Sequence, residues 1–177
     1  MNVSAPISIV VAAYSDRDDA AWDSTTVWSA RADGDFHHTS VALLNRDLDD
    51  ELQVLLSDST ATYRRWGGAL MGGPVFILAP AAGAKLLSAS GFTGAGAIIG
   101  HIRENADPVA LAAAADLPRA SPTSLVVVAV NRRAADMVVL LARATVTSTV
   151  DMLWGDLEEE LSHDFVKPQS EAMLLAG

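Results

Sequence analysis

Histidine side chains could provide a metal site, so their spacing comes first. His37 and His38 are adjacent in a segment that predicts a strand. Successive side chains on a strand point to opposite faces, so the two imidazoles cannot easily share one ion. His101 and His163 are isolated in the sequence. Because zinc requires three or four convergent ligands, we expect no metal site.

Two acidic runs, at residues 16–19 and 47–51, could in principle bind a divalent cation. The first run lacks the glycine and the final glutamate of a calcium-binding loop. Carboxylates at the start of a helix cap it and favour its first turn, which explains the first run. Turn formation explains the second. We therefore assign both runs to local structure.

Nucleophilic and nucleotide chemistry lack their sequence signatures. No serine stands in a glycine elbow, and the chain has no cysteine. Within the segment SGFTGAGAIIG, residues 90–100, the run from Gly94 through Gly96 to Gly100 is one residue longer than the dinucleotide fingerprint, and the segment follows an apolar stretch that predicts a helix. No Gly-Lys-Ser or Gly-Lys-Thr follows a glycine cluster. We expect neither catalytic residues nor a cofactor.

Composition limits the partners. The 177 residues include 12 Lys and Arg against 22 Asp and Glu, a formal net charge of −10. Nucleic acid is excluded as a partner, since binding phosphate needs a basic surface. Half of the residues are hydrophobic, which is enough for a buried core.

The order of the expected elements predicts an α+β fold of the ferredoxin-like type, with an antiparallel or mixed sheet. β-branched runs predict strands, and capping residues with an apolar stripe predict helices. The expected strands are Pro6–Tyr14, Phe36–Asn45, Glu51–Leu56, Thr123–Asn131 and Thr145–Leu153, and the expected helices are 16–32, 107–115 and Arg132–Ala144.

A glycine-rich apolar insert interrupts this pattern. Nine of the 12 glycines lie between Gly67 and Gly100, where Lys85 is the only charged residue. The simplest prediction is a hairpin of two helical arms joined at residues 80–83. The chain then divides into residues 1–59, the first half of the α+β domain; 60–104, the insert; 105–154, the second half; and 155–177, an acidic flexible tail.

Small residues four apart line one face of each arm, the spacing that lets helix backbones approach closely. Each arm has about 12 to 16 residues, or roughly 18 to 24 Å, against about 30 Å of bilayer hydrocarbon. Three interpretations stay open: membrane contact, self-association, or packing on the chain's own core. The expected contact residues are Trp66, Gly68, Met71, Gly72, Phe76, Ile77, Leu78, Leu86, Leu87, Gly91, Phe92, Gly96 and Gly100.

Charged residues at the ends of the hairpin predict interface anchors. Arg64 and Arg65 precede Trp66, the composition of a membrane-interface anchor, and Lys85 is near the hairpin tip. At the end of the acidic tail, Met173, Leu174 and Leu175 form a short apolar segment that could dock on a neighbouring subunit or another protein.

The order of these parts resembles domain-of-unknown-function family 1269, a family of uncharacterised bacterial membrane proteins. The resemblance covers about residues 7–153. It rests on the strand and acidic turn IVVAAYSD (9–16), the glycine-rich segments RWGGAL (65–70) and 91–100, and LAAAADLPRASPTSLVVVAV (111–130). The resemblance implies membrane association and transfers no catalytic residue. Lys85 within the insert and the long acidic tail depart from the family pattern.

These observations predict a non-enzymatic protein, membrane-associated on the cytoplasmic side or self-assembling, whose hairpin is the contact element. The alternative is a cytoplasmic homo-oligomeric scaffold or binding module whose hairpins form a buried apolar centre and which docks a protein or an apolar ligand.

Overall fold

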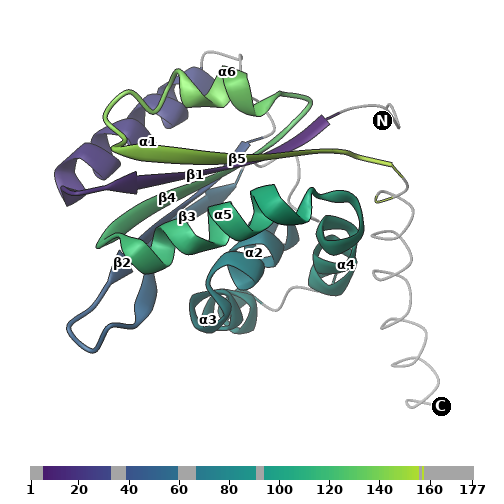
Figure 1. The fold of residues 1–177 in the computed structure, drawn as a ribbon, viewed down its shortest axis with the longest axis horizontal. Coiled ribbons are helices and arrows are strands. Elements are labelled where there is room, and N and C mark those ends of the chain that lie inside the picture. The colour runs from purple at the N-terminus through teal and green to yellow at the C-terminus, as the bar shows by residue number, and fades with distance from the viewer. Residues whose placement is uncertain (1–5, 33–38, 60–66, 91–93, 156, 158–177) are drawn as a thin grey trace.

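One five-stranded antiparallel sheet, with helices on both faces, organises the computed structural model, which describes residues 6–32, 39–59, 67–90, 94–155 and 157 (Figure 1). The strand order is β3-β2-β4-β1-β5. This confirms the expected α+β class. The strands are β1 (Pro6–Tyr14), β2 (Thr39–Arg46), β3 (Leu52–Ser59), β4 (Thr123–Val130) and β5 (Val146–Leu153).

The two strands richest in β-branched residues occupy the middle of the sheet. β1 and β4 pair in continuous register from Ile7 opposite Val130 to Tyr14 opposite Thr123. Every residue of β4, and every residue of β1 after Pro6, is buried. Runs without polar alternation are typical of strands covered on both faces, as these two are.

One face is covered by α1 (Arg17–Ala32) and the short helix α6 (Ala134–Val138). Val10, Tyr14, Val27 and Met137 are buried in the core on this side. On α1, Ala20, Ser24 and Val27 are buried, whereas Ala21 is exposed and Trp28 is half-buried.

The helix expected over Arg132–Ala144 is only five residues long. After Val138 the chain continues in tight turns, with the Leu141 N–H donating to the Val138 carbonyl. The Arg143 N–H then donates to the Asp23 carboxylate at 3.0 Å instead of to a helical carbonyl. This contact to α1 redirects the chain into β5, which explains why the helix stops early.

The opposite face is covered by α2 (Gly67–Leu78), α3 (Pro80–Ser90), α4 (Ala95–Asn105) and α5 (Pro108–Ala120) (Figure 1). Leu70, Met71, Val75 and Leu78 of α2 belong to the same core as the strand residues on this side, such as Val126. The insert is therefore packed on its own sheet.

The insert contains three helices and not the two arms expected. The break between α2 and α3 is the single residue Ala79, because Pro80 takes the first position of α3, where its missing N–H is not needed. The expected turn at 80–83 is thus the first turn of α3. The second arm is interrupted before α4 by Gly94, whose φ of 93° is left-handed and breaks the helix.

α5 begins as predicted and extends further than predicted. Asp107 accepts a hydrogen bond from the Val109 N–H, and Pro108 occupies the first turn. The helix passes the expected end at Ala115 and continues through Pro118 to Ala120. The Arg46 guanidinium binds the carbonyl oxygens of Pro118 and Arg119 and thereby caps the C-terminal end of the helix.

A buried polar pair joins α1 to the sheet. The Tyr14 hydroxyl donates to Asp23 at 3.0 Å, and both side chains are about 1% exposed. Burial raises the pKa of the Tyr14 phenol far above its usual range, and the negative charge of Asp23 raises it further. The folded state therefore holds the Tyr14 proton at pH values where the unfolded chain releases it.

This pair predicts alkaline sensitivity. Below pH 10 the Tyr14 contribution is fully present, and it is lost as pH rises above the unfolded tyrosine pKa of about 10, by at most ~1.4 kcal/mol per pH unit. Between pH 9 and 11, urea unfolding should show a shallower decline in the free energy of unfolding for Tyr14→Phe than for the wild type. Equal slopes in the two proteins would contradict this assignment.

Candidate functional site

The expected contact residues differ in how far they are buried, and some of them lie outside the described residues. Met71, Gly72 and Leu78 are buried within the helical layer. Phe76, Ile77, Leu86, Leu87 and Gly100 are half-buried, and Gly96 is exposed. Gly68 lies in the first turn of α2. Trp66, Gly91, Phe92, Arg64, Arg65, Met173, Leu174 and Leu175 lie outside the described residues, as do His37, His38 and His163.

Two glycines that sequence reasoning did not single out are the sites of closest helix approach. A Cβ atom on Gly83 of α3 would lie 2.2 Å from the Phe76 Cα of α2. A Cβ atom on Gly73 of α2 would lie 2.5 Å from Ile98 Cγ2 of α4. α2 thus packs directly against both neighbouring helices. The glycine-rich composition was the right signal for close packing, but the spacing of four residues did not identify these two positions.

The glycine pair that sequence reasoning did single out on α4 makes no close contact with the described part of the chain. A Cβ atom on Gly96 or Gly100 would meet no atom within 4 Å. Ile99, between them, is half-buried. On α3, Ala81, Ala84 and Ser88 are exposed. We refer to Gly96, Ile99 and Gly100 as the α4 stripe.

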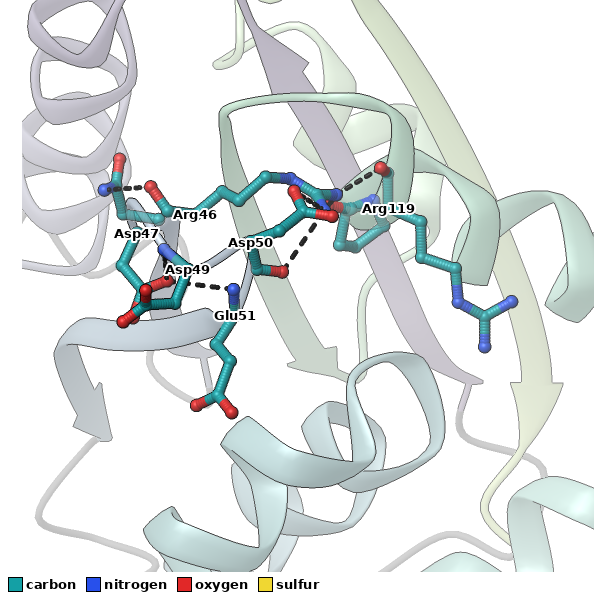
Figure 2. Close-up of polar contacts among 8 residues, drawn as sticks. Arg46, Asp47, Asp49, Asp50, Glu51 and Arg119 are labelled. Atoms are coloured by element: carbon teal, nitrogen blue, oxygen red, sulfur yellow. Dashed lines mark hydrogen bonds and ion pairs between the residues drawn. The ribbon is translucent and has the colours of Figure 1, made fainter.

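Next to the helical layer, the β2–β3 turn forms a cluster of charged side chains (Figure 2). Arg46 donates through Nη1 to Asp50 Oδ1 at 2.7 Å and through Nη2 to the Pro118 carbonyl at 2.8 Å. A pocket of about 250 Å³ lies between this turn and the α2–α3 junction, with Glu51 and Pro80 among its lining residues.

Asp47 holds the turn together. Its Oδ1 accepts the N–H groups of Asp49 at 3.0 Å and Glu51 at 2.9 Å, and its Oδ2 accepts the Gln53 amide. The Glu51 N–H, helped by the Asp49 N–H and the Gln53 amide, holds the pKa of the Asp47 carboxyl below its usual range. This carboxylate is occupied by local hydrogen bonds, the role predicted for the acidic run. Among the described residues, no three His, Asp or Glu side chains converge closely enough to hold a metal ion.

Lys85, expected near the hairpin tip as an anchor, lies in α3 and faces the same turn. Its Nζ is 3.4 Å from Glu51 Oε2, and both side chains are largely exposed. An exposed ion pair of this kind contributes little to stability, about 0–1 kcal/mol. Lys85 therefore has a partner within the chain.

A second pocket, of about 490 Å³, lies at the end of β5. Its lining comprises Pro6, Asn105, Arg133, Asp151, Met152 and Leu153. Asp151 Oδ1 accepts the Ala134 N–H at 3.0 Å and the Ser8 hydroxyl.

His101, expected to be isolated from other histidines, is buried and structural. Its Nε2 lies 2.8 Å from the Leu153 carbonyl oxygen, so Nε2 carries the proton, because a carbonyl only accepts. Its Nδ1 lies 3.3 Å from the Asn105 amide nitrogen and accepts from it. Nε2 thus ties α4 to the end of β5, and Nδ1 is hydrogen-bonded within α4.

Comparison with family models, curated proteins and solved structures finds no match to this chain. Within the described ranges, no helix combines the length and the apolar character needed to cross a membrane. The α4 stripe is a surface whose two glycines have no close neighbour among the described residues.

The glycines of α3 and α4 predict opposite effects of the same substitution. Gly83→Ala should destabilise the protein by about 1–3 kcal/mol, because the new methyl group overlaps the α2 backbone. Gly96→Ala should stabilise it by up to about 1 kcal/mol, since alanine favours a helix and meets open space. Urea unfolding measures both. A loss of stability in Gly96→Ala would show that this face is not open.

The Arg46 clamp predicts a loss of stability when the guanidinium is removed. Arg46→Met retains the aliphatic stem but leaves Asp50 and the α5 carbonyls without their donor, which should cost about 1–3 kcal/mol. Arg103→Met, on the exposed side of α4, is the matched control and should change little. Equal melting temperatures for the two variants would argue against the clamp.

Proposed function

We propose that this chain is a non-enzymatic association protein that forms homo-oligomers through the outer surface of its glycine-rich helical layer. The interface centres on the α4 stripe, with the small exposed residues of α3 as a second contact. The proposal includes fewer contact residues than the sequence predicted. Met71 and Leu78 are buried in the chain's own core, so only the residues at the surface are kept.

The observation that carries the proposal is that no described atom lies within 4 Å of a Cβ placed on Gly96 or Gly100. Glycine costs about 1 kcal/mol relative to alanine in a water-exposed helix. Gly73 and Gly83 offset that cost by close packing inside the chain, but the two α4 glycines do not. A second helix approaching the α4 stripe would supply the missing contact, as in other helix pairs with small residues four apart.

Self-association is favoured over membrane contact by the placement of the apolar side chains. Leu70, Met71, Val75 and Leu78 of α2 are buried in the core and unavailable to lipid in this packing, whereas Phe76 and Ile77 are half-buried. Lys85, the residue suited to a lipid headgroup, is paired with Glu51. The location that we propose first is the cytoplasm, as an oligomer. The second is peripheral attachment to the cytoplasmic side of a membrane.

This proposal includes the ferredoxin-like type of the fold and membership of family 1269. The order β5-β1-β4-β2, antiparallel throughout, supports a ferredoxin-like sheet to which β3 and α2–α5 are added. The same order of parts supports membership of family 1269. Docking of a protein through Met173, Leu174 and Leu175 stays a proposal based on the sequence.

The test is the molar mass of the purified protein by light scattering over a range of concentrations. We expect an oligomer whose dissociation constant rises by about tenfold or more, or ~1.4 kcal/mol, in Gly100→Leu, because the leucine holds the helices apart. Ala113→Leu, on the exposed side of α5, is the matched control. A monomeric wild type, or equal masses for the two variants, would overturn the proposal.

Vesicle flotation separates the membrane alternative. If the wild type floats with anionic phospholipid vesicles and Gly100→Leu floats equally well, contact with lipid and not helix packing explains the exposed layer. If neither protein floats while the oligomer persists, self-association stands alone.

A further inference from the structure

The outer edge of β5 is open. β5 pairs with β1 along its whole length, from Pro6 opposite Leu153 to Ala13 opposite Val146, and it is the last strand in the order. In the described part of the chain no segment pairs with its other side. An edge strand presents a row of unpaired N–H and C=O groups, which is a template for another strand.

The other edge of the sheet carries protective features. In β3, Leu55 is an extra residue, since Leu43 pairs with Leu56 and Leu44 with Val54. A bulge of this kind bends and twists an edge away from further pairing. Helix α3 also packs against β3. This edge is therefore a poor template for a partner.

β5 has no bulge, although helices α4, α5 and α6 pack against it as α3 packs against β3. Its pairing with β1 has no register shift, and its eight residues VTSTVDML include neither proline nor lysine. Asp151 is its only charged residue, and one of its carboxylate oxygens binds the Ser8 hydroxyl and the Ala134 N–H. Val146 and Leu153 are 51% and 59% exposed.

We propose that β5 pairs with β5 of a second copy in antiparallel register, so that two sheets join into one. In an antiparallel pair, directly opposite residues lie on the same face of the sheet. The two-fold axis must therefore pass midway between the two copies of one residue. The Thr145 N–H already extends the ladder to the Ala13 carbonyl at 2.8 Å. The paired stretch is then 145–153, with Thr149 at its midpoint.

This register is self-complementary. It places Thr147 opposite Asp151 of the second copy, where the hydroxyl can donate to the carboxylate. It places Val146 opposite Met152 and Thr145 opposite Leu153, which covers both exposed apolar ends. No carboxylate is opposite another, which matters for a chain of net charge −10. A second copy is the favoured occupant because its own β5 supplies a strand whose single carboxylate, that of Asp151, is opposite the Thr147 hydroxyl in this register.

The pairing is independent of the proposed helical interface, since β5 and α4 present different surfaces, and the two can be tested separately. The natural chain has no cysteine. Thr149→Cys therefore places one thiol per chain, on the proposed two-fold axis, and directly opposite strand residues are within reach of a disulfide. Thr25→Cys, on the exposed side of α1, is the matched control.

Under mild oxidation of purified protein, Thr149→Cys should convert mainly to a covalent dimer on a non-reducing gel, and Thr25→Cys should not. Adding Thr149→Lys to the Gly100→Leu variant should lower its mass to that of a monomer, because lysine on an edge strand blocks pairing. Adding Thr25→Lys instead should leave the mass unchanged. Similar cross-linking of the two cysteine variants would overturn the pairing. So would a Gly100→Leu protein that is already monomeric at high concentration.

Discussion

The pairing of β1 with β4 is the constraint on which the rest of the structure depends. Both strands are apolar on both faces, so neither side of the sheet can remain in contact with water. α1 and α6 cover one face, and the segment between β3 and β4 supplies α2 to α5, which cover the other. The glycine-rich helices are therefore part of the core of this domain before they are a contact surface for anything else.

That requirement explains how the glycines divide. A layer of helices must lie close to the sheet and close to one another, and Gly73 and Gly83 allow α2 to approach both of its neighbours. Gly96 and Gly100 make no such contact, although they have the spacing that a helix pair would use. One composition thus serves two purposes, internal packing and an outward surface.

The sequence was sufficient for the strands and for the class of fold, because runs such as TSLVVVAV have few other stable environments. It was not sufficient for contacts between distant segments. The early end of α6 depends on Asp23, more than a hundred residues away, and the extension of α5 through Pro118 depends on Arg46. Spacing along one helix also cannot show which glycine another helix will meet, which is why Gly83 was missed.

The segment that carries the helical layer leaves the sheet after β2 and returns to it at β4, and these two points are close together. The Arg46 N–H donates to the Pro122 carbonyl at 2.8 Å, and β2 and β4 are neighbours in the sheet. A tight turn could join these two strands directly without moving either of them. In the topology of the chain, residues 47–121 are thus like an inserted loop that can be separated from the rest. In the packing they cannot be separated, because removing them would uncover one whole face of the sheet.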